Sequence, residues 1–518
     1  MFDTNKQFSK ITKGGFFFSG GYFLALFLQF FVGIIVVRYL KRSEYGLLAL
    51  ANIIVGIIVT LCTLGFSDGI PRFMGFNLKR FEGKTSSFIP TVFTIVIVTS
   101  FLGVIFLYFQ APNIRLLFNK FGLDGILKPF AFMIAPLVFI RVLTSIFRGL
   151  EQVTPKVLFQ DIATNLSRLL LVLLVISFGL GLQGVTLAYV LAAWITFGAY
   201  LLYAKRHLYS WTPFSFDSSI AKDLVLFSLP LMGAGIISNL LGWLGTLFLG
   251  YFSSADQIGL YNAPLRLASL VSLPLIALVF LYLPVLSKNV SKKSFSEIGK
   301  YYSRTTKWGF LGALCLLLYF LYDAEFVVTK IFGSAYLASS EVLKIMAVGF
   351  SIHAFMGPNG ATLISLGHTG TIFSGTLLSG IFAFVLCILF VPRYGAIGAA
   401  FAMATARIIS NIFFSATLYL KAGIHPFNRD YLKPILCSGL LILVLRSFVR
   451  PFEFTSNFEH VALFLVIFIV VILAPFVTRS VEETDFELLG EIEYQIRKST
   501  KITDKIASLF RHRKDLEN

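Results

Sequence analysis

Long runs of apolar residues follow one another from about residue 14 to residue 478, separated by short polar segments. A helix of about 20 apolar residues spans the hydrocarbon core of a bilayer, and lipid forces the backbone to satisfy its own hydrogen bonds. Transmembrane barrel strands would alternate apolar and polar residues, which these runs do not do. The pattern predicts an all-α integral membrane protein with about 14 transmembrane helices, near 14–38, 45–66, 86–110, 127–149, 156–180, 183–204, 222–250, 258–287, 305–322, 341–366, 369–391, 396–420, 431–449 and 460–478.

The composition agrees with this reading. Of the 518 residues, 57% are hydrophobic and 14% are charged, with 57 Phe, whereas soluble domains carry about 25% charged residues. A soluble, disordered or nucleic-acid-binding protein is excluded, although the net charge is +18. The basic excess indicates membrane topology and an anionic ligand.

The distribution of Lys and Arg predicts the orientation, because cytoplasmic loops are richer in both. Five connections form the richer set, including 72–84 and 288–307, and both ends of the chain fall on that side. We therefore expect a multi-pass protein of the cytoplasmic membrane with both termini in the cytoplasm. The first outer loop, with Arg38, Lys41 and Arg42, is itself basic and is an exception to the rule.

The two halves of the chain resemble each other. RYLKRSEYGLLALA near the start corresponds to GYFSSADQIGLYNAPLRL near residue 250, and GLGLQGVTLAYVLAA corresponds to RYGAIGAAFAMATA. Three glycine pairs, Gly46 and Gly259, Gly149 and Gly367, and Gly184 and Gly398, are separated by 213, 218 and 214 residues. We expect two pseudo-symmetric six-helix bundles that enclose a central cavity, which is a transporter architecture.

The domain organisation follows from the repeat. It comprises a cytoplasmic N-terminal stub (1–13), an N-terminal six-helix bundle (14–204), a C-terminal six-helix bundle (222–421), helices 13 and 14 (431–478) and a charged, amphipathic cytoplasmic tail (479–518). In the tail, apolar residues recur at helical spacing, which is typical of a helix lying under the headgroups or of a solvated tail.

No motif indicates a metal, a cofactor or a catalytic centre. The cysteines Cys62, Cys315, Cys387 and Cys437 each lie in an apolar run without metal-ligand spacing, so they are interpreted as packing residues. There is no GxxxxGK[ST] phosphate loop and no nucleophile elbow. The sequence predicts neither a cofactor nor a metal site, and it predicts that the protein is not an enzyme.

Several motifs carry a family resemblance. RYLKRSEYGLLALA with LGFSDGIPRFM, FSLPLMGAGIISNL with FLGYFSSADQIGLYNAPLRL, and RYGAIGAAFAMATARI stand in the order and spacing found in lipid-linked oligosaccharide flippases. Over roughly residues 10–420 the chain resembles the Wzx-type (polysaccharide transporter) flippases of the multidrug/oligosaccharidyl-lipid/polysaccharide (MOP) exporter superfamily. The resemblance implies transport of a lipid-linked glycan. The segment LGWLGTLFLGYF lacks the carboxylate that many relatives carry there, so an ion-coupling role does not carry over to it.

Four arginines inside the apolar runs are the predicted substrate-binding residues: Arg141, Arg168, Arg266 and Arg407. A charge in the membrane costs several kcal/mol unless it faces water or a partner, and guanidinium groups bind phosphate oxygens in bidentate fashion. The alternatives are interhelical salt bridges or side chains that extend to the headgroups.

Four further residues are candidates for coupling or tuning. Asp161 lies on one helical face with Arg168 and is expected to tune it. His353 is a protonatable group in mid-helix, and Asp68 with Arg72 forms an i, i+4 pair that could be structural.

The function predicted from the sequence is a flippase that moves a polyprenyl- or dolichyl-linked oligosaccharide across the cytoplasmic membrane by alternating access. Its expected partners are the lipid-linked oligosaccharide, membrane lipids and glycan polymerase or transferase machinery, with no nucleic acid. A MATE-like drug antiporter is one alternative, although cationic drugs need carboxylates in the cavity. A membrane glycosyltransferase or polymerase is the other, although the outer loops are short and hold few acids.

Overall fold

The computed structural model describes residues 4–77, 85–208, 216–291, 294–449, 456–481 and 485. These residues form helices and their connections, with no strand among them. The predicted all-α class is therefore confirmed. Helix α1 begins at Thr4, so most of the predicted stub continues the first helix. The predicted tail 479–518 lies, apart from 479–481 and 485, outside the described residues.

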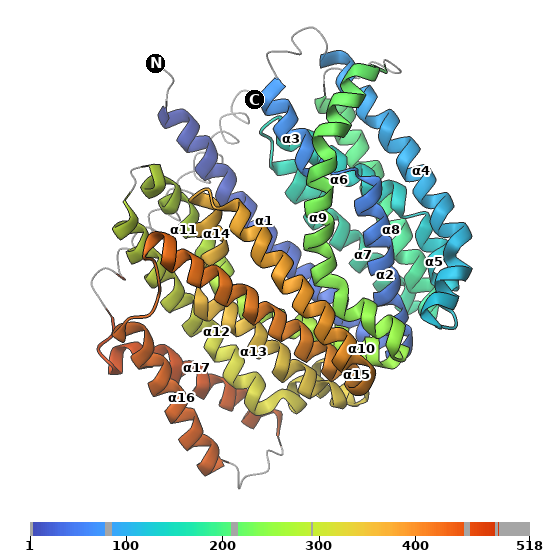
Figure 1. Ribbon diagram of the computed structural model, residues 1–518. Helices are drawn as coiled ribbons and strands as arrows, with labels where there is room; N and C mark the ends of the chain where they lie inside the picture. The colour runs from blue at the N-terminus through green and yellow to red at the C-terminus, as the bar shows by residue number, and fades with distance from the viewer. Residues whose placement is uncertain are drawn as a thin grey trace, which may run out of the picture.

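The first half of the chain forms the helices α1 to α8, which are coloured blue to teal in Figure 1. In chain order these are α1 (Thr4–Tyr39), α2 (Arg42–Cys62), α3 (Phe66–Asn77), α4 (Thr85–Phe118), α5 (Leu123–Ala131), α6 (Ile134–Gly149), the π-helix η1 (Lys156–Ala163), α7 (Thr164–Ser177) and α8 (Gly181–His207). Most of their side chains are apolar, and each helix satisfies its own backbone hydrogen bonds, as a segment in lipid must.

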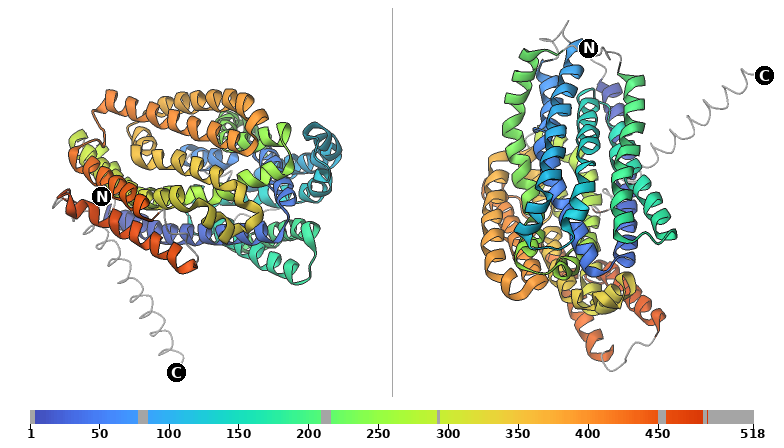
Figure 2. Two further views of the ribbon diagram at one scale, coloured as in Figure 1. Left: turned by 90° about the horizontal axis from the view of Figure 1, so that it is seen from below. Right: turned by 90° about the vertical axis from the view of Figure 1, so that its right-hand side faces the viewer.

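The second half repeats this order. Its elements are α9 (Ser218–Phe252), α10 (Ala255–Ser269), η2 (Leu270–Ser272), α11 (Leu273–Ser291), α12 (Phe295–Phe332), η3 (Ser334–Ser339), α13 (Ser340–Met356), α14 (Asn359–Ser365) and α15 (Thr369–Ala422). Two more helices, α16 (Arg429–Val449) and α17 (Asn457–Val477), lie on the α12 side of this bundle, away from the first half (Figures 1 and 2).

Eleven helices in the described residues are long and apolar enough to cross a membrane, or twelve if a bent pair is one span. The predicted number of 14 is not confirmed by this count. One reason is α15, whose 54 residues count once. At 1.5 Å per residue α15 is far longer than one crossing, and it turns back on itself at Gly395 (Figure 1).

The bend in α15 has a counterpart in the first half. Gly395 has φ +52°, and Gly181, 214 residues earlier at the start of α8, has φ +59°. A side chain is disfavoured at positive φ, so glycine suits both positions. In both places a side chain binds the backbone amide that begins the new helix: Tyr39 Oη accepts from Gly181 N at 2.8 Å, and Gln257 Oε1 accepts from Ala396 N at 2.8 Å.

The two halves meet through α2 and α10 with reciprocal contacts. A Cβ atom on Gly46 would lie 2.0 Å from the carbonyl oxygen of Ala255, and one on Gly259 would lie 2.4 Å from that of Arg42. Arg42 and Ala255 are themselves 213 residues apart, the same spacing as the two glycines. Contacts that map onto each other in this way are those of a two-fold axis, here relating the two halves of one chain.

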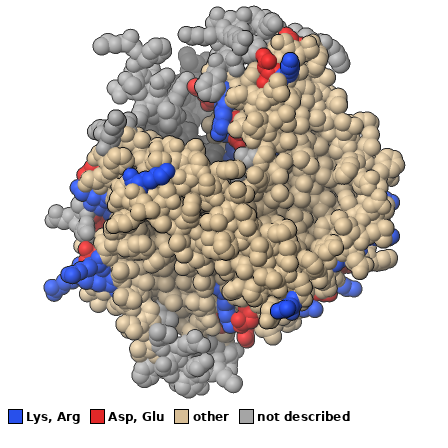
Figure 3. All heavy atoms as spheres, in the orientation of Figure 1, with Lys and Arg blue, Asp and Glu red and all other residues tan. Residues whose placement is uncertain are grey.

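At the other end two groups of helices diverge. In Figure 1, α3 and α9, which pack together although they come from different halves, stand on one side, and α11 and α14 stand on the other, towards the N-terminus. The space-filling view is hollowed in this region, with charged side chains at the edge of the hollow (Figure 3). The protein therefore has one closed end, at α2 and α10, and one splayed end.

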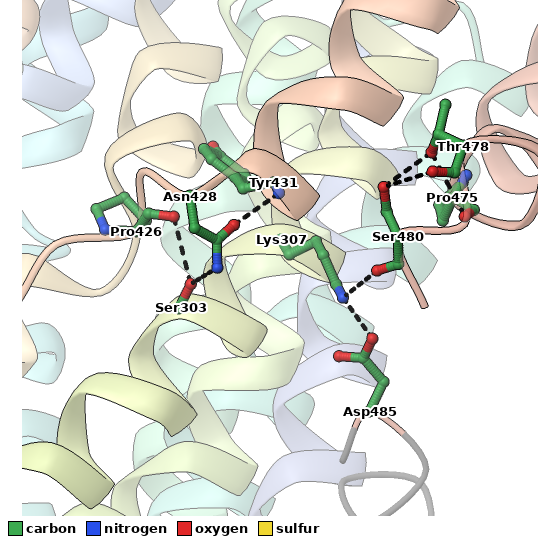
Figure 4. Close-up of polar contacts among 9 residues, drawn as sticks. All are labelled: Ser303, Lys307, Pro426, Asn428, Tyr431, Pro475, Thr478, Ser480 and Asp485. Carbon is green, nitrogen blue, oxygen red and sulfur yellow. Dashed lines mark hydrogen bonds and ion pairs between the residues drawn. The ribbon is translucent and has the colours of Figure 1, made fainter. Parts of the chain in front are cut away.

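A buried ion pair fixes the chain after α17 to α12. Lys307 Nζ contacts the carboxylate of Asp485 and donates to the carbonyl of Ser480 at 3.1 Å (Figure 4). Lys307 is 5% and Asp485 3% exposed. Removing one member of such a pair leaves the other charge buried alone, which costs about 3–5 kcal/mol.

The close approach of α2 and α10 gives a first prediction. Gly46→Ala and Gly259→Ala each place a methyl group against a backbone carbonyl, so we expect each to destabilise the protein by about 1–3 kcal/mol. Thermal unfolding in detergent, followed by intrinsic fluorescence, measures the effect. Gly235→Ala in α9 is the control, since a Cβ there meets nothing within 4 Å; equal unfolding temperatures for all three variants would contradict the packing.

Candidate functional site

Two guanidinium groups, one from each half, lie together between the bundles. Arg168 on α7 stacks on the ring of Tyr189 on α8, with Cζ 4.4 Å from the ring centre. Arg266 on α10 donates from Nε to the hydroxyl of Tyr45 on α2 at 3.2 Å. Tyr189 lies near both arginines, and the two guanidinium charges act on each other. The structure therefore brings together two of the four predicted cations.

A glycine on α1 makes room for this arrangement. A Cβ on Gly33 would lie 2.5 Å from Nη1 of Arg266, so any side chain there would displace the guanidinium group. Tyr45 stands in the first turn of α2, close to the α2–α10 contact. The Arg168–Arg266 pair consequently lies towards the closed end of the protein.

No carboxylate of the described residues forms an ion pair with Arg141, Arg168, Arg266 or Arg407. In addition, Nε of Arg168 is buried and has no hydrogen-bond partner in the described part of the chain. Buried polar groups are nearly always paired, and an unpaired charge is more costly still. The arrangement is chemically suited to accept an anion that brings oxygen acceptors.

Arg141 occupies a separate position along α2. Its Nη1 donates to the hydroxyl of Thr60 at 3.3 Å. Thr60 is 15 residues beyond Tyr45 on the same helix, a rise of about 22 Å. Arg141 is thus a second cationic position, nearer the splayed end than the Arg168–Arg266 pair.

Arg407 and His353 belong to the second half. Arg407 lies over the ring of Phe350, with Cζ 4.1 Å from its centre. The Nδ1 atom of His353 bonds the side-chain oxygen of Asn411 at 2.9 Å, and that oxygen also accepts from Asn359 at 3.2 Å. Because an amide oxygen only accepts, Nδ1 of His353 is the donor in this bond. A coupling role for His353 stays a prediction.

The contacts of Asp161 differ from the expected ones. Its carboxylate pairs with Lys156 at 3.1 Å, whereas Arg168 stacks on Tyr189. Asp161 lies in the π-helix η1, whose wider turn breaks the regular spacing on which the shared face with Arg168 was based. A tuning role for Asp161 therefore has no direct contact to support it.

The expected pair of Asp68 and Arg72 is replaced by a long-range one. Asp68 lies 3.6 Å from Nη1 of Arg148, which also donates to the carbonyl of Ser67 at 3.2 Å. This pair ties α3 to the end of α6, while Arg72 is exposed. The prediction of an i, i+4 lock was wrong because α6 supplies the nearer cation.

A cluster at the closed end was not predicted as functional. Arg38 donates to the carbonyls of Lys330 and Ile331, at 2.8 Å for Ile331, and Arg42 donates to the carbonyl of Ala335 at 2.8 Å. Arg42 also lies 3.5 Å from the carboxylate of Asp256. We call Arg38, Arg42 and these partners the closing cluster. The carbonyls at the end of α12 lack helical partners and carry negative dipole charge, which suits guanidinium groups.

The sequence does contain a signal for this cluster. Both arginines stand in the basic first loop, on the side where the topology rule expects few cations. What they bind could not be read from the sequence, because the carbonyl acceptors lie 292 or 293 residues away and Asp256 lies in the other half.

Comparison with known proteins places the chain in a family. The family model "Polysaccharide biosynthesis protein" matches residues 11–290, which is more than half of the chain. The chain belongs to this polysaccharide biosynthesis protein family. The resemblance to the Wzx-type flippases is thereby confirmed.

One curated relative is the teichuronic acid biosynthesis protein TuaB of Bacillus subtilis (strain 168). It is 24% identical over 318 residues, which are 59% of this chain and 63% of TuaB. The match thus spans less than two thirds of that relative's length.

Solved structures share the fold. The lipid II flippase MurJ in an inward closed conformation has a TM-score of 0.73 at 16% identity, covering 90% of this chain and 98% of MurJ. An inward-facing MATE family multidrug transporter of the MOP superfamily has a TM-score of 0.61 at 16% identity, covering 78% of this chain and 94% of the transporter. The chain is thus a multi-pass membrane protein of the polysaccharide biosynthesis family, and its fold is that of these solved transporters.

The uncompensated arginines give a second prediction. Because Arg168 has no carboxylate partner among the described residues, Arg168→Gln should leave the unfolding temperature unchanged or raise it by a few degrees. Lys307→Gln should lower it clearly, because it isolates the buried Asp485. Thermal unfolding of both variants without substrate measures this difference, and a large loss of stability in Arg168→Gln would indicate a structural role.

Proposed function

We propose that the protein is a flippase for a lipid-linked oligosaccharide on a polyprenyl or dolichyl phosphate or diphosphate carrier. It moves this glycolipid across the cytoplasmic membrane, from the cytoplasmic to the outer leaflet, by alternating access. The observation that carries the proposal is the Arg168–Arg266 pair, which the two halves build together without a carboxylate partner in the described chain.

The chemistry of a phosphate or diphosphate matches this pair. Arg binds phosphate oxygens through two parallel N–H donors, and Nε of Arg168 is a donor without a partner in the described structure. The anion offsets the repulsion between the two guanidinium groups, and they replace part of its hydration. Tyr45 and Tyr189 beside them offer aromatic and hydroxyl surface to a sugar.

The relatives support a glycolipid substrate. MurJ, which shares the fold, is named as a flippase of lipid II, and TuaB is named for teichuronic acid biosynthesis. An interior with four arginines fits an anionic headgroup better than the cationic drugs of the antiporter alternative. A glycan polymerase or transferase that uses the flipped substrate is the partner that this role implies.

The closing cluster suits the alternating-access step. If both termini are cytoplasmic, the splayed end faces the cytoplasm and the cluster holds the outer end shut. Its four interactions join α1 to α12, α2 to η3 and α2 to α10, all at the closed end. They must break before the cavity opens outward, so they set the balance between the two conformations.

A leaflet-resolved glycolipid assay tests the proposed function. In a strain that lacks the protein, precursor should accumulate in the cytoplasmic leaflet, and the wild-type protein should restore export. Arg168→Gln and Arg266→Gln should each reduce the flipping rate about tenfold or more, since each removes charge-assisted hydrogen bonds. Arg206→Gln, in the exposed last turn of α8, is the control.

Full complementation by both cavity variants would remove the cationic-cavity mechanism. Precursor that collects in the outer leaflet without further polymer, in the strain lacking the protein, would favour an enzyme instead.

The closing cluster gives a separate prediction. Arg38→Gln combined with Arg42→Gln should weaken the closed end by about 1–2 kcal/mol and raise the outward-open population roughly 5–30-fold. Spin labels at the exposed Phe121 and Leu337, one in each half, report the distance across this end in a variant without the native cysteines. Arg115→Gln is the matched control, because its partner Asp124 lies in the same half; an unchanged distance distribution in the double variant refutes the gating role.

A further inference from the structure

A cavity lies within the second half, away from the Arg168–Arg266 pair. Its volume is about 450 Å³, and the ends of α12, α13 and α15 and the connection to α16 form its walls. Ligand sites in proteins typically have volumes of about 300–1,000 Å³, so the cavity is large enough for part of a lipid. Its lining residues are Tyr302, Met356, Ile412, Ser415, Ala416, Tyr419, Ile424, His425, Pro426 and Phe427.

One stripe of α15 forms a whole side of the cavity. Ile412, Ser415, Ala416 and Tyr419 stand at i, i+3, i+4 and i+7, which is one helical face, and they line about 10 Å of helix. Ile412 is 49% and Tyr419 56% exposed. The stripe is therefore an accessible apolar surface rather than part of the packed core.

Three polar groups on the wall already have partners in the protein. The hydroxyl of Tyr302 donates to the carbonyl of Met356 at 2.5 Å, and Ser415 Oγ accepts from Asn359 at 3.0 Å. The carbonyl of Pro426 accepts from Ser303 at 3.3 Å. Water in such a cavity finds few hydrogen-bond partners, so the remaining surface suits a hydrocarbon chain.

The wall next to α16 is built rigidly (Figure 4). Asn428 accepts from the amide of Tyr431 at 2.7 Å and donates to Ser303 at 3.4 Å, which fixes the connection to α12. Tyr431 in turn donates to the carbonyl of Phe355 at 2.7 Å. The cavity is thus preformed, which reduces the entropic cost of binding.

The mouth carries aromatic and basic groups. The rings of Tyr419 and His425 lie 5.4 Å apart, and those of His425 and Phe427 are stacked at 6.5 Å. Arg429, the first residue of α16, is exposed two positions after Phe427. Aromatic rings with a neighbouring cation are typical of the membrane interface, where a lipid phosphate lies.

We propose that this cavity binds one phospholipid of the surrounding membrane. An acyl chain lies along the α15 stripe, and the phosphate lies at the mouth near His425 and Arg429. All of the walls belong to the second half, so the bound lipid moves with that half. The site does not depend on the proposed substrate, and the two can fail independently.

Native mass spectrometry of the full-length protein tests this site. The protein is washed with detergent and then mixed with micelles of palmitoyl-oleoyl phosphatidylglycerol. We expect wild type to keep one such lipid under activation that strips the others, and Ala416→Trp, which fills the cavity, to keep about tenfold less. Leu420→Trp is the matched control, because Leu420 is 82% exposed, one turn on and outside the lining.

Two further measurements separate the contribution of the acyl chains from that of the headgroup and provide a milder substitution. Dihexanoyl phosphatidylglycerol has the same headgroup but lacks long chains, and it should not be retained. Ala416→Leu, a smaller change, should give an intermediate loss and serves if Ala416→Trp does not fold. Retention by folded Ala416→Trp, equal retention of the short-chain lipid, or displacement of the phospholipid by a polyprenyl glycolipid would each overturn the proposal.

Discussion

The interior of this protein holds positive charge that its own described carboxylates do not neutralise. Arg168 and Arg266 come from different halves and are held by tyrosines, one by stacking and one by a hydrogen bond. In a membrane such charges are costly, so their cost must be offset by water, by headgroups or by an anionic ligand. Both halves must be in place for the pair to exist, which ties the binding of an anion to the relative position of the bundles.

The glycines at the closed end allow that relative position. Gly46 and Gly259 bring α2 and α10 into backbone contact through reciprocal approaches, and the closing cluster adds exposed polar contacts around them. Exposed ion pairs are individually weak. The closing cluster can therefore open at low cost, while the packing of α9 against α2, α3 and α4 keeps the two halves joined.

Much of the fold could be predicted from the sequence because lipid leaves the backbone little choice. Apolar run length predicted the helices, and the glycine spacing near 214 predicted a repeat, which Gly181 and Gly395 show at the same spacing. The number of spans differs where one helix bends, because α15 holds two of the predicted runs in a single helix of 54 residues. Arg168 and Arg266 were expected to be cavity cations, but their proximity could not be read from residues 98 positions apart.

The predictions that failed share a physical cause. Asp68 and Asp161 were assigned partners from regular helical spacing, but a π-helix and a neighbouring helix supply nearer cations, Lys156 and Arg148. The same limit applies to Arg38 and Arg42, which donate hydrogen bonds to backbone carbonyls. Every residue has a backbone carbonyl, so the sequence does not show which carbonyls at the end of a distant helix will accept these hydrogen bonds.

The most direct test of the central idea is a binding comparison with the purified protein. Polyprenyl diphosphate and the corresponding uncharged polyprenol are each titrated at low and high salt, with wild type and with Arg168→Gln/Arg266→Gln. We expect wild type to bind the diphosphate at least about tenfold more tightly than the alcohol, and we expect the double variant to lose this preference. Equal affinity of wild type for the two lipids would contradict an anion-binding role for the guanidinium pair.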